Sequence, residues 1–167
     1  CGAVGQSSQE IVKKMITALR HRGPDDFGCF TDETVSLGHT RLAIIDVSPS
    51  GHQPMSSANQ KIWIVYNGEL YNFREEREIL RKKGYSFKST SDTEVVLKMY
   101  EEYGEEFLGR MRGIFSLSIW DIRRGKGREK LLLARDQIGV KPLLFYAKNQ
   151  LLIFASELKA LLASNLV

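Results

Sequence analysis

Apolar residues recur at three- and four-residue spacing in three stretches of the chain, and this spacing predicts amphipathic helices. The stretches carry Ile11, Met15, Ala18 and Leu19; Phe73, Ile79 and Leu80; and Val95, Val96, Met99 and Tyr100. They end near residues 22–23, at Gly84 and near Gly104. Each is preceded by a capping residue with a glutamate three positions later, as in a capping box. These pairs are Ser7 and Glu10, Asn72 and Glu75, and Ser91 and Glu94.

The remaining apolar runs are typical of strands. They predict strands at residues 35–38, 42–45, 62–66, 114–120, 131–134, 143–146 and 151–155, with a last helix that begins near Ser156 and carries Leu158, Leu161 and Leu162. Short loops join the later strands, as in antiparallel sheets. Helices before and after long antiparallel runs indicate the α+β class. Because no repeat or low-complexity linker interrupts the pattern, residues 1–167 are interpreted as one domain.

Composition excludes several classes of protein. Two cysteines cannot build a disulfide framework, no apolar run approaches the roughly 20 residues of a membrane span, and no signal peptide opens the chain. We therefore expect a cytoplasmic protein that does not bind membranes. The net charge of +4 comes partly from residues 81–83 and 123–128, interpreted as a helix end and a hairpin loop rather than a nucleic-acid surface. The three histidines are too scattered to indicate a metal site.

The first residue, Cys1, carries candidate chemistry. An N-terminal cysteine places a thiol next to an α-amine, and the reference pKa values of both groups, roughly 8.5 and 8, lie close to neutral pH. The amine can therefore serve as the base for its own nucleophile.

Asn67 and Gly68 follow an apolar strand and permit two interpretations. Such a pair commonly forms a hairpin turn, but the segment after it is too short for a return strand. Alternatively, the Asn67 amide and the Gly68 N–H form an oxyanion hole at the end of the strand.

Two charged residues, Arg41 and Asp92, also permit two interpretations each. Arg41 stands before an apolar run, where it forms either an ion pair or a clamp for a substrate carboxylate. Asp92 is favoured by the helix dipole, yet Ser91 and Glu94 already satisfy the capping box and leave the Asp92 carboxylate available. With Glu69, it could hold an ammonium group. Together these residues suit an α-amino acid whose side chain ends in an amide.

Seven blocks of the sequence resemble the glutaminase domain of class II glutamine amidotransferases, in its glutamine-hydrolysing asparagine synthetase branch. They are residues 1–5, 20–25, 38–42, 66–72, 91–94, 135–143 and 155–161. They stand in family order and span almost the whole chain. The resemblance implies the N-terminal nucleophile hydrolase fold, with four αββα layers in which two antiparallel sheets lie between helices.

The resemblance also implies roles for individual residues. Cys1 would attack the glutamine side-chain carbonyl and form a glutamyl thioester, with its amine shuttling the proton. Asn67 and Gly68 would hold the oxyanion.

By the same resemblance, Arg41 would bind the α-carboxylate of glutamine, Glu69 and Asp92 would bind its α-amino group, and backbone near Leu42 and Ile44 would line the pocket. Residues 20–25 would form a loop that substrate orders.

Two departures from the family pattern set further expectations. The chain has no Ser-Gly-Gly-x-Asp-Ser pyrophosphate-binding segment, so an ATP-dependent synthetase part, with its ATP and magnesium, is expected elsewhere as a partner domain or subunit. No cofactor is expected in this domain. The chain also stops before the final stretch of the family's domain, which suggests either C-terminal truncation or a shortened stand-alone protein. The open alternatives are the glucosamine-phosphate and phosphoribosylamine branches, and a non-catalytic glutamine-sensing domain.

Overall fold

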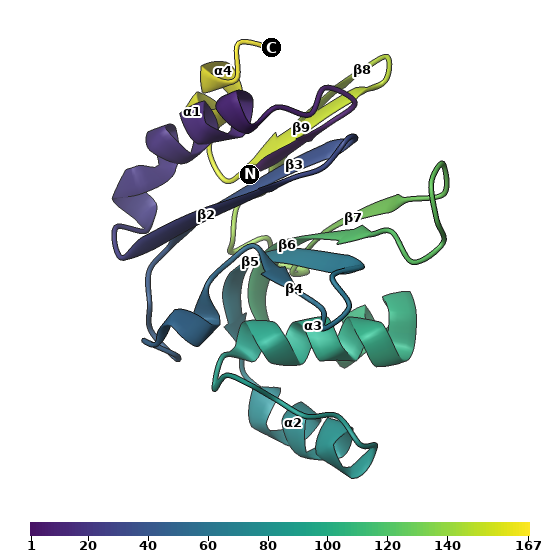
Figure 1. Ribbon diagram of the computed structural model, residues 1–167. Helices are drawn as coiled ribbons and strands as arrows, with labels where there is room; N and C mark the ends of the chain where they lie inside the picture. Colours follow the sequence, from purple (N-terminus) through teal and green to yellow (C-terminus); the bar gives the residue numbers. More distant parts are fainter. The chain divides into compact units, whose positions relative to one another are not determined.

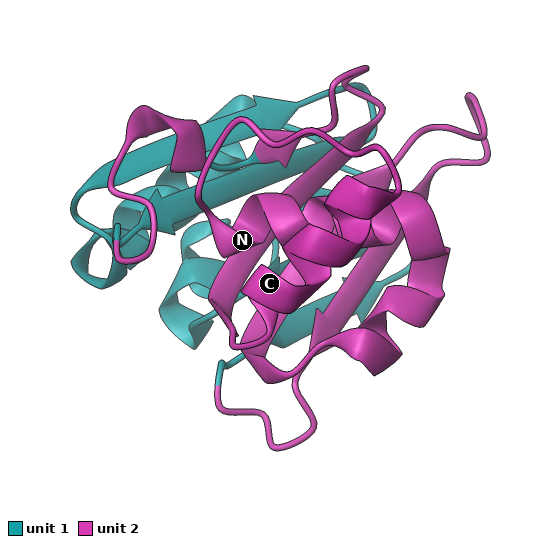
Figure 2. Cartoon of the chain, turned by 90° about the horizontal axis from the view of Figure 1, so that it is seen from below, with its two compact units in different colours: residues 1–43, 52–54, 141–167 teal, residues 44–51, 55–140 magenta.

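Two antiparallel sheets, one in each of two units, form the framework of the chain. The computed structural model describes all residues from 1 to 167. One unit consists of residues 1–43, 52–54 and 141–167, and the other of residues 44–51 and 55–140 (Figure 2).

The first unit contains a five-stranded sheet. Its strands are β1 (Gly2–Val4), β2 (Asp26–Thr31), β3 (Val35–Arg41), β8 (Leu144–Lys148) and β9 (Leu151–Ala155), in the order β2-β3-β1-β9-β8. The short strand β1 lies in the middle, with antiparallel partners on both sides. The sheet thus holds the N-terminus of the chain at its centre.

Two helices, α1 (Gln9–Leu19) and α4 (Leu158–Ala163), pack together on this sheet (Figure 1). The predicted apolar face of α1 is confirmed in part, since Met15 and Leu19 are buried with Val12. Ser8, rather than the predicted Ser7, caps the helix by accepting a hydrogen bond from the Ile11 N–H. The 3-10 turn η1 (Arg20–Arg22) ends the helix before Gly23, as predicted.

The second unit contains a four-stranded sheet in the order β4-β5-β6-β7. Its strands are β4 (Met55–Ser56), β5 (Ile62–Leu70), β6 (Gly113–Asp121) and β7 (Lys130–Arg135). Helix α3 (Asp92–Tyr103) packs on β5, and α2 (Phe73–Lys82) packs on α3. The segments η2 (Pro49–Gly51) and η3 (Gly104–Arg110) are 3-10 turns.

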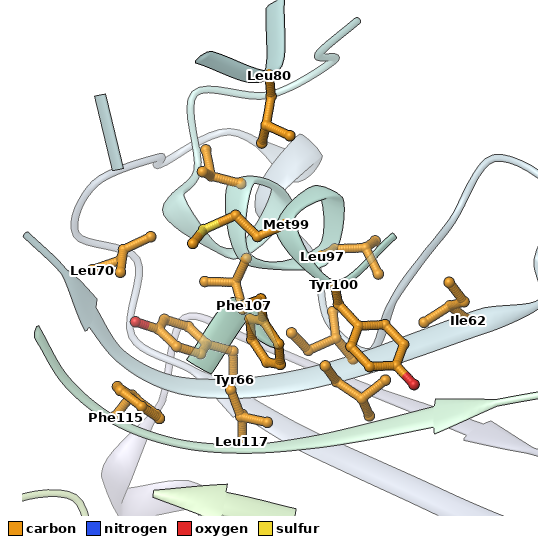
Figure 3. Close-up of a cluster of buried hydrophobic side chains, with 14 residues drawn as sticks. Ile62, Tyr66, Leu70, Leu80, Leu97, Met99, Tyr100, Phe107, Phe115 and Leu117 are labelled. Carbon is orange, nitrogen blue, oxygen red and sulfur yellow. The ribbon is translucent and has the colours of Figure 1, made fainter. Parts of the chain in front are cut away.

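Apolar side chains from α3 and from the facing side of the sheet form the core of this unit (Figure 3). Met99 and Leu97 of α3 are buried with Tyr66 of β5, Leu117 of β6 and Phe107 of η3. The alternation along β5 and β6 leaves Asn67 and Glu69 on the opposite face, because successive side chains of a strand point to opposite sides.

Three strands were not predicted, and one predicted strand is wrong. β1, β2 and β4 are short or rich in polar residues and glycine, so they lack the apolar run that the prediction used. Residues 42–45 are not a strand, since β3 ends at Arg41. Arg41 pairs with Asp26, the first residue of β2, so the chain has no neighbouring strand beyond that point.

Two of the predicted capping boxes are also wrong. Asn72 makes no side-chain cap bond and instead bridges Arg110 and Arg112. Ser91 caps α3, but the Glu94 carboxylate accepts hydrogen bonds from Ser89 rather than reaching back to Ser91.

The α+β class is confirmed, because each unit combines an antiparallel sheet with helices packed on it. None of the helices is long and apolar enough to cross a membrane.

Candidate active site

Cys1 lies at the head of β1, the central strand of the first unit. Its α-amino nitrogen donates a hydrogen bond to the Gly38 carbonyl at 2.9 Å, and its own carbonyl accepts one from the Gly38 N–H at 2.8 Å. The Sγ atom lies 3.5 Å from the same Gly38 oxygen. One backbone carbonyl therefore holds the amine and the thiol of Cys1 side by side.

Burial changes the chemistry of this amine. Cys1 is 9% exposed, and burial lowers the pKa of its α-amino group to about 5. Removal from water disfavours the charged ammonium, so the amine is neutral at pH 7 and can accept a proton. This is the property that a base for the neighbouring thiol requires.

Gly38 is required where it stands. A Cβ atom there would lie 2.7 Å from the Val12 side chain and 2.8 Å from the Ile16 side chain, so a larger residue would force these buried side chains of α1 to shift. The Gly38 carbonyl was not predicted as a site group, since a backbone oxygen leaves no trace in residue type.

Arg41 occupies the last position of β3 and is 8% exposed. The loop that contains residues 23–25 passes over it, as the Asp25 N–H donates to the Arg41 carbonyl at 3.1 Å. Gly23 permits this approach, because a Cβ atom there would lie 2.5 Å from the Arg41 nitrogen. Leu42 follows outside the sheet and is 56% exposed.

The predicted block at residues 155–161 has a clear structural role. The Glu157 carboxylate accepts hydrogen bonds from His21 and Arg22, both at 2.9 Å, and pairs with Lys159 at 3.3 Å. Hydrogen bonds from Arg22 and then His21 lower the pKa of Glu157 to about 2 against the opposing effect of burial. Glu157 thus anchors the start of the loop at residues 20–25.

Asn67 lies within β5 of the second unit, so both of its earlier interpretations need correction. The strand continues through Asn67 and Gly68 to Leu70, which excludes a hairpin turn and also places the pair inside the strand rather than at its end. The Asn67 side-chain nitrogen is buried and has no hydrogen-bond partner. A buried amide without a partner is costly, and such a group needs an explanation.

Gly68 pairs with Phe115 of β6 in a position where neither residue bonds the other. Phe115 directs its N–H and its carbonyl to Asp136 instead, at 3.0 and 2.8 Å. In an antiparallel pair the opposite residue then also directs its N–H away from its partner, so the Gly68 N–H points to the outer edge of β5. β4 covers that edge only at Trp63 and Ile64.

Asp92, the first residue of α3, lies on the same edge. Its Oδ2 accepts a hydrogen bond from the Leu70 N–H at 3.0 Å, and Leu70 is two residues beyond Gly68 on the same side of β5. The carboxylate is therefore not wholly available, contrary to expectation. Asp92 is 5% exposed, and burial raises the pKa of its carboxyl against the opposing effect of the Leu70 bond.

The predicted residues fall into two groups. Cys1, Arg41 and Leu42 belong to the first unit, while Ile44, Asn67, Gly68, Glu69 and Asp92 belong to the second. Within the second unit, β5 and the start of α3 bring the last four together, and Ile44 lies on an exposed loop. No three or more histidine, cysteine, aspartate or glutamate side chains are grouped so that they could hold a metal ion.

A sequence model of the glutamine amidotransferase domain matches residues 1–167, from Cys1 to the end of the chain. The chain belongs to the glutamine amidotransferase domain family. Among curated relatives, this domain is 42% identical to asparagine synthetase [glutamine-hydrolyzing] 1 of Bacillus subtilis, a match that covers 99% of the chain and 27% of the relative. It is 38% identical to a putative asparagine synthetase of Methanocaldococcus jannaschii, over 93% of the chain and 32% of the relative.

Amidase chry2 of Gibberella zeae is also 38% identical, over 95% of the chain and 24% of the relative. The amidotransferase domain thus spans only about a quarter to a third of the length of these relatives.

Solved structures show the fold. The glutamine phosphoribosylpyrophosphate amidotransferase of Bacillus subtilis matches with a TM-score of 0.82 at 20% identity, over 98% of this chain and 43% of that one. A second structure, titled as the allosteric regulatory enzyme of purine biosynthesis, matches with a TM-score of 0.79 at 20% identity, over 98% and 43%. The expected N-terminal nucleophile hydrolase fold is confirmed.

Proposed function

We propose that this domain hydrolyses the side-chain amide of glutamine to glutamate and ammonia through a thioester on Cys1. The observation that carries the proposal is the buried Cys1 amine, which has a pKa of about 5 and shares the Gly38 carbonyl with the thiol. In the first step Sγ bonds to the amide carbon and the thiol proton passes to the amine. The amine then gives this proton to the departing nitrogen, the C–N bond breaks, and ammonia leaves.

Water completes the reaction. It attacks the thioester carbon while the Cys1 amine takes one of its protons, and the C–S bond breaks to release glutamate and restore the thiol. The atoms balance with glutamine and water as the only reactants.

Asn67 and Gly68 are the proposed oxyanion donors. The buried Asn67 amide nitrogen has no partner within the folded chain, and the Gly68 N–H points to the outer edge of β5. Donors that are fixed before the reaction stabilise a charge that develops on oxygen, because they need not reorient. This role accounts for a buried polar group that the fold leaves unsatisfied.

The chain has candidate residues to bind the two charged groups of glutamine, its α-carboxylate and its α-ammonium. Arg41 would bind the α-carboxylate, Glu69 and Asp92 would bind the α-ammonium, and backbone at Leu42 and Ile44 would line the pocket. The raised pKa of Asp92 fits this role, since a carboxylate that is costly to ionise in a buried place gains from a cation nearby.

We further propose that the ammonia serves an ATP-dependent synthetase part like that of the glutamine-hydrolysing asparagine synthetases. In this proposal ATP and magnesium act only there, and this domain uses no cofactor. The free thiols of Cys1 and Cys29 suit a cytoplasmic location, where disulfides are rare.

Ammonia release from glutamine tests the proposal, with the two cysteines as a matched pair. Cys1→Ala should reduce release to the background rate, and Cys1→Ser should lie between, because a hydroxyl is harder to ionise than a thiol. Cys29→Ala should retain wild-type release. Near wild-type release by Cys1→Ala would overturn the mechanism.

An uncleaved methionine before Cys1 provides a second variant. It converts the amine to an amide without a basic lone pair while leaving the thiol in place, so it should be nearly as damaging as the loss of the thiol.

A further inference from the structure

The loop between β3 and β4 shows an inverted pattern of burial. Its apolar residues Ile44 and Val47 are 74% and 78% exposed, whereas the carboxylate residue between them, Asp46, is 7% exposed. A charged side chain is buried only where other groups satisfy it. The hydrogen-bond partners of Asp46 therefore show which segment of the chain this loop is attached to.

Asp46 joins two segments that lie far apart in the sequence. Its Oδ1 accepts hydrogen bonds from the Ser48 N–H at 2.8 Å and the Ser48 hydroxyl at 2.6 Å, which shape its own loop. Its Oδ2 accepts a hydrogen bond from the Thr90 N–H at 2.8 Å. Burial raises the pKa of Asp46, but the bonds from Ser48 and Thr90 together bring it well below its ordinary value. The carboxylate is therefore ionised throughout the neutral range.

The segment at residues 88–91, which donates this bond through the Thr90 N–H, leads directly into Asp92. Arg77 of α2 donates to the carbonyls of Ser89 and Ser91, at 2.8 and 3.0 Å. Glu94 of α3 accepts from the Ser89 N–H at 2.7 Å. Arg77 and Glu94 belong to the adjacent helices. Of these hydrogen bonds, only the one that Asp46 accepts from Thr90 connects the segment to the loop of Ile44.

We infer that Asp46 is a positioning residue that fixes Asp92 and the loop of Ile44 relative to each other, and so sets the affinity for the α-amino end of glutamine. The inference rests on the proposed function. All its residues lie in the second unit. Because Asp46 acts through Asp92, its loss should weaken the binding of ligands that carry an α-amino group and spare those that lack one.

Calorimetry on a Cys1→Ala background, which prevents turnover, tests the inference with two ligands. Glutamine carries the α-amino group, and glutaric acid monoamide lacks only that group. Asp46→Ala should weaken glutamine binding about tenfold or more, as expected for a lost hydrogen bond to a charged group, and change the binding of the monoamide less than about twofold. Asp46→Asn keeps one of the two acceptor oxygens and should fall between.

Asp32→Ala is the matched control. Asp32 also accepts backbone bonds within a turn, from Thr34 and Val35, but it lies in the first unit. It should leave the binding of both ligands unchanged. Thermal unfolding of each variant identifies loss of fold, and if Asp46→Ala does not fold, Asp46→Asn decides the outcome.

A double-mutant cycle completes the test. The losses for Asp46→Ala and Asp92→Asn should not add, because the second change removes the group through which the first acts. Equal losses for both ligands, no loss for glutamine, or additive losses would overturn the inference. Failure of the parent protein to bind glutamine would instead overturn the proposed function.

Discussion

The Cys1 amine is the group whose protonation governs the proposed reaction. Since burial lowers its pKa to about 5, the amine is neutral above that pH and protonated below it. We expect kcat/KM for glutamine to be level near neutral pH and to fall about tenfold for each pH unit below 5, because only the neutral amine accepts the thiol proton.

A pH–rate profile of ammonia release measures this fall of kcat/KM at acid pH, with circular dichroism at each pH to show that the fold persists. An acid limb near pH 8, the ordinary value for an α-amine, would contradict the account.

We expect the Asp92 carboxylate to lower the stability of the fold and to strengthen the binding of glutamine. Burial raises the pKa of its carboxyl, so between its ordinary and its raised pKa the folded state binds more protons than the unfolded state. The contribution of Asp92 to stability therefore falls as pH rises through that window. Asp92→Asn removes this titration, and the variant should gain in free energy of unfolding relative to wild type as pH rises from 4 to 8.

Urea unfolding at both pH values gives this difference directly, and KM for glutamine should rise in the same variant. A difference in stability that shrinks with rising pH would show that the carboxylate is stabilised, not strained, by its burial.

The pairing of strands β5 and β6 leaves no room for a side chain at Gly68. A Cβ atom there would lie 2.3 Å from the Ile114 oxygen and 2.7 Å from the Phe115 Cα, both backbone atoms. Gly68→Ala should therefore destabilise the fold by about 1–3 kcal/mol and lower kcat, because the strand must shift.

Gly109→Ala is the control, since a Cβ atom there would have no neighbour within 4 Å. Its effect should stay within about 0.5 kcal/mol. Chemical denaturation and initial rates for the two variants make the comparison, and equal small effects would show that β5 tolerates a side chain at Gly68.

The elements that the sequence predicted well are those with long apolar patterns. β5, β6, β9 and helix α3 agree because their apolar residues are buried against a partner, and β7 agrees with its apolar residues half-buried. β2 escaped prediction since its sequence, Asp-Phe-Gly-Cys-Phe-Thr, has no run of β-branched residues. Conversely, residues 42–45 are apolar without being a strand, because no neighbouring strand extends beyond the Arg41–Asp26 pair.

The candidate site shows a similar difference. The position of Cys1 indicates candidate chemistry, and the residues themselves left two interpretations open for each of Arg41, Asn67 and Asp92. The family resemblance was needed to choose between those interpretations. The Gly38 carbonyl and Asp46 could not be predicted, because their importance depends on hydrogen bonds formed across 37 and 44 residues of sequence.

For the molecule as a whole, the proposed groups belong to two units: the nucleophile and Arg41 to one, and the oxyanion donors and Asp92 to the other. The family model matches residues 1–167 and so spans both units. The curated relatives have much longer chains, and this domain matches 27% of the length of the Bacillus subtilis asparagine synthetase.

Covalent labelling tests the central claim, that Cys1 is the nucleophile for glutamine, most directly. A glutamine analogue with a diazoketone in place of the side-chain amide alkylates an attacking thiolate with loss of nitrogen gas, and the resulting thioether is stable to digestion. Peptide mass spectrometry should find one label per chain, on Cys1, and glutamine should slow its formation. Labelling of Cys29, or labelling of Cys1 that glutamine does not slow, would contradict the account.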